Sequence, residues 1–260
     1  MLTGANATHR VFRMGAASGC KPESAVVTCA NCKVNSLCLP AELNRQQLDQ
    51  VEDMVGARIK VKRGSALFAT GDRFKSLYVV RTGFLKTETT LEDGRRWVRG
   101  FQMAGEMLGL DAIANEAHTC DAIAMEDSDV CVMPYDLLES TSRRVVALQR
   151  HLHRAMSREI LREGSLMQQT GMPAQERLAA FLLNLSERLH ARGFSRSELV
   201  LRMSREEIGS AVGLKLETVS RMFSKFAADG IVTIQQRHVN ILDMAALREI
   251  ANAKLRSCTH

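Results

Sequence analysis

The sequence predicts an α+β fold: an antiparallel β-roll of the jelly-roll type, then a long helix, then a C-terminal winged helix-turn-helix. Three observations predict it. Short β-type runs separated by glycine fill about 59–133, a proline-free helical stretch covers about 137–169, and two helices joined by a glycine turn lie beyond residue 204. Many short, regularly spaced strands are typical of a small barrel or roll. Two helices around a tight turn are typical of a helix-turn-helix.

Composition narrows the class of protein before any motif is considered. The 260 residues are 45% hydrophobic and 25% charged, as in ordinary soluble proteins. The net charge of +6 favours a polyanionic partner. The N-terminal segment has no apolar run of signal-peptide length, and no stretch is long enough to span a bilayer. Because seven cysteines in such a chain point to a reducing compartment, we expect a cytoplasmic protein without a membrane partner.

Three thiols follow residues 1–28, a segment rich in small residues that we expect to be a flexible arm. Cys29, Cys32 and Cys38 have the spacing C-x2-C-x5-C. Fe–S clusters are held by such Cys thiolates, usually four, with one often remote in sequence. Zinc would normally need a second C-x2-C pair or a closely spaced His pair, which the sequence lacks. The residues alone leave open an Fe–S cluster, zinc, a disulfide, redox thiols or no role, and Cys20 and Cys120 compete as a further ligand.

The cysteines begin a first domain that we place at 29–136. Apolar residues at helical spacing predict a short amphipathic helix beside the cysteine loop, with Leu43, Leu48, Val51 and Met54 on one face. Glycines then separate the predicted strands of the roll, at 66–68, 77–80, 84–87, 97–99 and 130–133. Such a roll commonly encloses a ligand or serves as a sensor scaffold, and a purely structural barrel is the alternative.

Residues 137–170 are predicted to form one long helix with a narrow apolar stripe. The stripe consists of Leu152, Met156, Ile160, Glu163 and Met167. Such a seam favours pairing with a second copy of the chain over burial in a domain core, so we expect a homodimer. Glu163 would bring two carboxylates together and make the dimer marginal, which suits a switch. The alternative is a slightly different phase of the stripe.

Gly171 and Pro173 end that helix, and a DNA-binding domain is predicted at 171–250, before a short tail at 251–260. Ser204 and Glu207 form a capping box at the start of one helix, and a glycine turn separates it from a second. An inward face of the second helix is predicted for Leu216, Val219, Met222, Phe223 and Phe226. A β-hairpin wing over 232–242 completes a winged helix-turn-helix, whose second helix enters the major groove.

The outward face of the second helix carries Glu217, Ser220 and Arg221. Arg can bind guanine O6 and N7, Glu can accept from cytosine N4, and Ser can serve base or phosphate, so we predict base contacts there. Phosphate contacts, which supply salt-dependent affinity, are predicted for Arg205, Lys215, Lys225 and Arg237. A solvated helix face is the alternative for these residues.

Five motifs, spread over about 29–250, carry a resemblance to a known family. They are Cys29-x2-Cys32-x5-Cys38-Leu39-Pro40, Gly71-Asp72-x2-Lys75-Ser76-Leu77-Tyr78, Val130-Cys131-Val132-Met133-Pro134, Glu176-Arg177-Leu178-Ala179-Ala180-Phe181 and Glu217-Thr218-Val219-Ser220-Arg221. Together they resemble the CRP/FNR superfamily, which has a cupin-like roll. The resemblance is strongest to the FNR branch, the oxygen-responsive fumarate and nitrate reductase regulators.

The resemblance implies a [4Fe–4S] cluster that is stable without oxygen and is held by Cys29, Cys32, Cys38 and, through its flanking Val-Cys-x-x-Pro pattern, Cys131. It implies an active homodimer that binds palindromic TTGAT-type sites in double-stranded DNA, works with RNA polymerase, and activates or represses transcription. The family's acidic residue on the dimer helix matches Glu163. Lys33 departs from the family's pattern, because it places a cation beside the cluster.

Other classes of function are weighed against the same residues. A cyclic-nucleotide sensor would pair Gly105-Glu106 with an Arg-Ser or Arg-Thr, but 117–121 has no arginine to neutralise a phosphate. A haem sensor could use His118 but would leave the cysteines unexplained. A regulator that responds through thiol redox chemistry without an Fe–S cluster remains an alternative. No nucleophile–base constellation, phosphate loop or H-E-x-x-H motif is present, so an enzyme is not expected.

Overall fold

The computed structural model describes residues 28–169 and 171–251, except for the side chains of 163–169. Most of the predicted arm at 1–28 and of the tail at 251–260 lies outside the described residues, as do Cys20 and Cys258. The side chains of Glu163 and Met167 lie outside them too.

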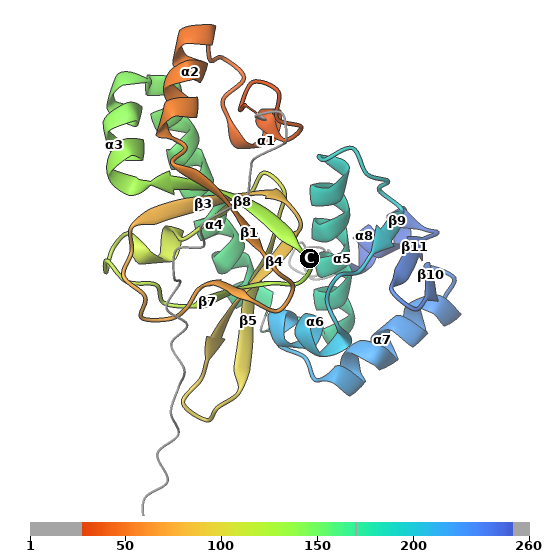
Figure 1. The fold of residues 1–260 in the computed structure, drawn as a ribbon. Coiled ribbons are helices and arrows are strands. Elements are labelled where there is room, and N and C mark those ends of the chain that lie inside the picture. The colour runs from red at the N-terminus through yellow and green to blue at the C-terminus, as the bar shows by residue number, and fades with distance from the viewer. Residues whose placement is uncertain (1–27, 170, 252–260) are drawn as a thin grey trace, which may run out of the picture.

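An antiparallel β-roll forms the centre of the described chain (Figure 1). One four-stranded sheet has the order β1-β8-β3-β6, and the other has the order β2-β7-β4-β5. Apolar side chains from both sheets meet in one core, where Val80, Leu85 and Val130 are fully buried. The predicted α+β class with a roll is confirmed. The strands are β1 (Ala57–Val61), β2 (Ala66–Phe68), β3 (Ser76–Thr82), β4 (Phe84–Thr90), β5 (Arg96–Met103), β6 (Met107–Leu108), β7 (Asp121–Ala124) and β8 (Ser128–Pro134).

Two helices precede the roll. α1 (Asn35–Cys38) lies within the cysteine loop, and α2 (Arg45–Met54) is the predicted amphipathic helix. A capping box satisfies the free amides at the start of α2. Val51 and Met54 are buried in one apolar cluster with residues of β3 and β8, so α2 holds the end of the cysteine loop against this sheet.

The prediction of a single helix over 137–169 is wrong, because two helices occupy this part of the chain. α3 (Tyr135–Arg144) and α4 (Val146–Gln169) meet at Val145, whose φ of −110° and ψ of 86° are not helical. Val145 is 1% exposed, in one apolar cluster with residues of both helices. The bend lets both helices bury side chains in that cluster, and the adjacent β-branched Val146 further weakens helix continuity.

The C-terminal part forms the predicted winged helix-turn-helix. A three-stranded sheet with the order β10-β11-β9 contains the predicted wing and one strand, β9, that the sequence did not predict. The elements are α5 (Ala174–His190), β9 (Glu198–Val200), α6 (Arg205–Val212), α7 (Leu216–Ala228), β10 (Val232–Gln235), β11 (His238–Ile241) and α8 (Met244–Ala251). None of the helices within the described residues is long and apolar enough to cross a membrane.

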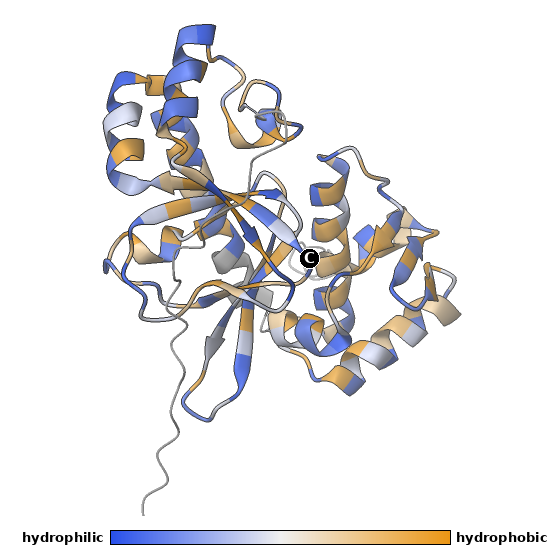
Figure 2. Ribbon diagram, in the orientation of Figure 1, coloured by the Kyte–Doolittle hydropathy of each residue, from blue (hydrophilic) through white to orange (hydrophobic). Residues whose placement is uncertain are grey.

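The winged domain packs directly against the roll. Phe84, Val98, Phe101 and Met103 of β4 and β5 share one apolar cluster with residues of α5, α6 and α7. α6 lies beside β5 (Figure 1). Figure 2 shows α5 rich in hydrophobic residues, whereas the outer turns of α2 are hydrophilic. The two domains are therefore joined by a continuous core rather than by a linker alone.

Candidate functional site

Four cysteines that are far apart in the sequence line one small cavity. Cys29, Cys32 and Cys38 come from the loop that ends in α1, and Cys131 comes from β8. Asn35 shapes the loop, since its backbone amide donates to Cys32 O (3.0 Å) and its Nδ2 donates to Cys29 O (2.9 Å). The other walls are mostly apolar, with Val34, Leu39, Val51, Val55, Val79 and Met133.

Cys131 is the rigid member of the set. It lies in the middle of β8, paired with Arg58 of β1 on one side and with Val79 of β3 on the other. Cys120, a rival for the fourth position, is buried in the core of the roll, with its Sγ 3.6 Å from Asp111 Oδ2. The structure therefore brings Cys131, and not Cys120, to the three loop thiols.

Three charged residues adjoin the cysteines, namely Glu52, Arg58 and Arg81. Glu52 of α2 accepts hydrogen bonds from the Cys29 amide and from Arg58 Nη2, the latter at 3.1 Å. Burial acts to raise the pKa of Glu52, but these hydrogen bonds lower it overall. Burial raises the pKa of the Cys131 thiol, although the neighbouring Arg58 guanidinium acts to lower it. Arg58 thus connects Glu52, which binds the cysteine loop, to Cys131 of β8.

Burial favours the uncharged form of the Cys29 and Cys38 thiols, because it raises the pKa of both. Burial raises the pKa of Cys38 to about 12, and the nearby Cys32 and Cys131 add to the effect. Burial also raises the pKa of Cys29, as does its hydrogen bond with Glu52. Four ionised thiolates carry more negative charge than the Arg58 and Arg81 guanidinium groups of the cavity wall can neutralise, and metal binding would supply the rest. Four cysteines are the donor set that an Fe–S cluster takes.

The four thiols line one cavity but are not grouped tightly around one point. Among the described residues, no three His, Cys, Asp or Glu side chains are grouped closely enough to hold one metal ion. A structural zinc site gathers its ligands tetrahedrally around one centre. The cysteines that the structure describes are not gathered in that way.

The helix-turn-helix begins with the predicted capping box. Ser204 Oγ accepts from Glu207 N (3.1 Å), and Glu207 Oε2 accepts from Ser204 N (2.8 Å). At the other end of α6, Arg177 of α5 donates to the carbonyls of Val212 (3.3 Å) and Gly213 (3.1 Å). Because the last carbonyls of a helix lack helical partners, Arg177 fixes the turn before α7. We did not predict this role from the sequence. The only signal for it was that Arg177 belongs to the family motif at 176–181.

The predicted base-reading residues share one surface of α7. Glu217, Ser220 and Arg221 are exposed, while the opposite face is buried through Val219, Phe223 and Phe226. Leu216 was predicted to face inward but is 45% exposed. It lies in the first turn of α7, ahead of the turns whose apolar side chains fill the core.

The predicted phosphate contacts lie in different environments. Lys215, Lys225 and Arg237 are all exposed, and Lys225 Nζ donates to Gln175 Oε1 (3.0 Å). The guanidinium carbon of Arg205 lies 3.4 Å from the centroid of the Phe223 ring. Arg205 Nη1 is buried, with no hydrogen-bond partner among the described residues. This cation–π contact holds Arg205 against α7, so it has less freedom to reach a phosphate than Lys215 or Arg237.

The predicted dimer stripe divides into a buried and an exposed part. Leu152 is 8% exposed within the chain's own apolar cluster, and Met156 packs against that cluster. Ile160 is 70% exposed, and so is Leu161, which the predicted stripe did not include. Adjacent exposed apolar side chains of this size mark a surface suited to a second copy of the chain.

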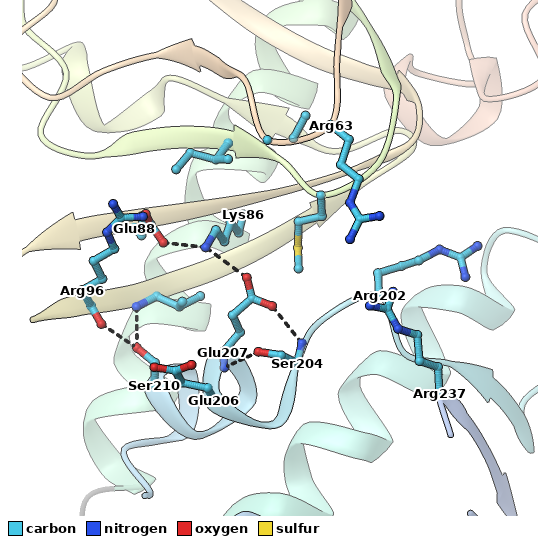
Figure 3. A pocket seen from close by; sticks show the side chains of 15 residues that line it. Arg63, Lys86, Glu88, Arg96, Arg202, Ser204, Glu206, Glu207, Ser210 and Arg237 are labelled. Atoms are coloured by element: carbon cyan, nitrogen blue, oxygen red, sulfur yellow. Dashed lines mark hydrogen bonds and ion pairs between the residues drawn. The ribbon is translucent and has the colours of Figure 1, made fainter. Parts of the chain in front are cut away.

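Polar contacts join the roll to α6 in the cleft that Figure 3 shows. Lys86 Nζ of β4 lies 2.7 Å from Glu88 Oε2 and 3.0 Å from Glu207 Oε1. Ser210 Oγ of α6 donates to the Arg96 carbonyl (3.1 Å). The Glu88 side chain is 2% exposed, so Lys86 neutralises a buried carboxylate while it binds the first turn of α6.

Two family models match the chain. A model of the cyclic nucleotide-binding domain matches residues 58–144, and a model of the Crp-like helix-turn-helix domain matches residues 176–250. The transcriptional regulatory protein btr of Bordetella pertussis is 40% identical over 223 residues, covering 85% of this chain and 92% of that protein. The fumarate and nitrate reduction regulatory protein of Escherichia coli K12 is 35% identical and covers 93% of this chain and 95% of its own length.

Solved structures show the same architecture. FixK2 from Bradyrhizobium japonicum has a TM-score of 0.68 and 28% identity, covering 75% of this chain and 96% of that one. The regulator CLP of Xanthomonas campestris, at 19% identity and a TM-score of 0.63, shares the fold over 77% of this chain and 100% of its own. With the roll, the winged helix-turn-helix and these relatives in agreement, the chain belongs to the CRP/FNR family of transcription regulators.

Proposed function

We propose that this protein is an oxygen-responsive transcription regulator that holds a [4Fe–4S] cluster on Cys29, Cys32, Cys38 and Cys131. The observation that carries the proposal is the meeting of three loop thiols and one β8 thiol at a single apolar cavity. Relatives named anaerobic regulatory protein, from Pasteurella multocida, and fumarate and nitrate reduction regulatory protein, from Vibrio cholerae, are 39% and 37% identical to this chain. Their names support a response to oxygen supply.

The residues around the cavity suit this role. When bound, the cluster would compensate the four thiolates and supply an oxygen-sensitive redox centre. The pairing of β8 on both sides fixes Cys131, while Glu52 of α2 holds the first cysteine of the loop by accepting from the Cys29 amide. Lys33 is exposed, so its ammonium group stays in water rather than among the thiols.

On the output side, α7 would enter the major groove of a palindromic TTGAT-type site. Glu217, Ser220 and Arg221 would read bases, and Lys215 and Arg237 would contact phosphates, because all five side chains are exposed. A homodimer would present two copies of α7 one helical turn of DNA apart. RNA polymerase would be the further partner, in the cytoplasm.

A nucleotide-responsive regulator is less well supported by the roll. The cavity between the roll and α4 is lined by Arg99, Gln102, Asp111 and Thr119, and has a volume of about 460 Å³. Arg99 Nη1 already donates to Thr119 Oγ1 (2.9 Å). The Asp111 carboxylate would oppose a phosphate there. A thiol-redox regulator is less well supported as well, since such chemistry needs a thiolate and burial raises the pKa of Cys29 and of Cys38.

Iron analysis of anaerobically purified variants tests the proposal. The wild-type protein should be brown, with about four irons per chain. Cys131→Ala should lose the iron and the anaerobic DNA binding. Cys120→Ala, a buried cysteine away from the cavity, is the matched control and should keep both. An iron-free wild-type protein that binds its operator fully under anaerobic conditions would refute the assignment.

A further inference from the structure

The turn between β5 and β6 carries a buried carboxylate that holds the DNA-binding domain. Glu106 Oε1 lies 2.9 Å from Arg188 Nε and 2.8 Å from Arg192 Nη2, and Glu106 Oε2 lies 2.5 Å from Arg188 Nη2. The three side chains are only 13%, 17% and 9% exposed, in that order. Both arginines also bind the backbone of the roll, Arg188 at the Phe101 carbonyl and Arg192 at the Ala104 carbonyl (2.6 Å). This group of contacts fixes the C-terminal half of α5 and the turn that follows it to the roll.

The same turn supports the cysteine loop. Leu37 of α1 packs over Gly105, where a Cβ atom would lie 2.6 Å from Leu37 Cβ. Gly105 also has a φ of +84°, so both the contact and the backbone demand glycine. Cys38, Gly105 and Glu106 line one small cavity together with Arg162 of α4. The turn that contains Gly105 and Glu106 therefore contacts the cysteine loop, lies beside α4 and binds the DNA-binding domain.

Two other ionic contacts between the roll and the winged domain lie away from the cysteine loop. Lys86 and Glu207 meet on α6, and Arg202 Nε lies 2.8 Å from Glu126 Oε2 at the rim of the roll. The Arg202 and Glu126 side chains are 41% and 37% exposed. Neither pair belongs to the cavities that the cysteine loop lines. Glu126 thus provides a matched comparison: a cross-domain carboxylate–arginine pair away from the cysteines.

We propose that Glu106 is a positioning residue that transmits the state of the cysteine loop to the DNA-binding domain by holding Arg188 and Arg192. A signal passes between two sites only through contacts that differ between its two states. Ordering of the loop around a metal centre sets the position of Leu37 on Gly105, and the next residue carries the ion pairs to α5. This role of Glu106 rests on the proposed function, because the signal that it transmits starts at the metal centre of the cysteines.

Hydrogen exchange of the full-length protein tests this route. Exchange in the peptide covering 183–192 is compared between anaerobic iron-loaded protein and iron-free protein. In the wild type the two should differ by about fivefold or more, and in Glu106→Gln the difference should fall to about twofold or less. Arg188→Gln breaks the contact from the other domain and should act in the same direction. Glu126→Gln should retain the wild-type difference.

The outcomes separate this inference from the proposed function. If Glu106→Gln binds normal amounts of iron and keeps the full wild-type difference in exchange, Glu106 does not carry the signal. The same conclusion follows if iron changes the DNA affinity of the wild type without changing exchange in α5. If the wild type binds no iron at all, the proposed function itself fails. Circular dichroism of iron-free Glu106→Gln checks that the variant is folded, and Arg188→Gln provides the test if it is not.

Discussion

Lys86→Met should lower the free energy of unfolding by about 3 kcal/mol, because it strands a buried carboxylate. Glu88 is 2% exposed and has two cationic partners, Lys86 at 2.7 Å and Arg96 at 3.1 Å. The Arg96 side chain is 69% exposed, so water screens its attraction to Glu88. Removing one partner from a buried pair costs about 3–5 kcal/mol, and the remaining Arg96 places the expected loss at the lower end. Methionine keeps the aliphatic stem, so the packing changes little.

The assay is urea unfolding of iron-free protein at pH 7, followed by circular dichroism. Lys86→Met combined with Glu88→Gln should recover part of the loss, because the double variant no longer buries an unpaired charge. Lys62→Met is the matched control: Lys62 and Asp127 form an ion pair at 2.6 Å, but their side chains are 78% and 63% exposed. Its unfolding should be unchanged within error. A Lys86→Met protein as stable as the control would refute the reasoning.

The same ion pairs predict a dependence on alkaline pH. Burial acts to lower the pKa of Lys86, but the hydrogen bonds to Glu88 and Glu207 raise it overall. A group whose pKa is raised by folding stabilises the protein below its unfolded pKa, about 10.4 for lysine, and loses this contribution as pH rises through the folded value. The difference in stability between wild type and Lys86→Met should therefore shrink above pH of about 10.4.

Further predictions concern the dimer, the DNA surface and the acid dependence of stability. Glu163→Ala should give more dimer and DNA binding in air, measured by analytical ultracentrifugation and gel shift; unchanged monomer content would contradict the predicted repulsion across the two-fold axis. Arg221→Ala should cost about 1–3 kcal/mol for the cognate site and weaken discrimination at one base pair, whereas Lys215→Ala should lower affinity for all sequences and reduce the salt slope by about 1. Burial acts to raise the pKa of Glu106, but the guanidinium groups of Arg188, Arg192 and Arg162 lower it overall. Its stabilisation should be complete above pH of about 4.3 and be lost as the pH falls through the lower pKa of the folded state, so urea unfolding of Glu106→Gln should depend less on acid pH.

The sequence predicted those parts of the fold that local patterns determine. The capping box of Ser204 and Glu207, the turn at Gly213 and the hairpin wing are all encoded by residues within a few positions of one another. The break at Val145 was missed because it depends on how α3 and α4 share a core, which periodicity does not reveal. β9 was missed because three residues carry too little alternation to mark a strand without its partner β11.

In the candidate site, too, the sequence predicted the local part and missed the contacts between distant residues. The spacing of Cys29, Cys32 and Cys38 pointed to a common centre, but only the fold shows Cys131 beside them and Cys120 elsewhere. Glu106 was visible in the sequence only as half of a nucleotide-binding pattern. Its partners lie more than eighty residues away, with 82 positions to Arg188, and no local signal announces such a pair.

The most direct test of the account follows colour and DNA binding in the same anaerobic sample as air is admitted. We expect a brown protein with a high affinity for a TTGAT-type palindrome, and both properties should fade together as oxygen enters. A colourless sample whose operator affinity stays the same before and after aeration would contradict it.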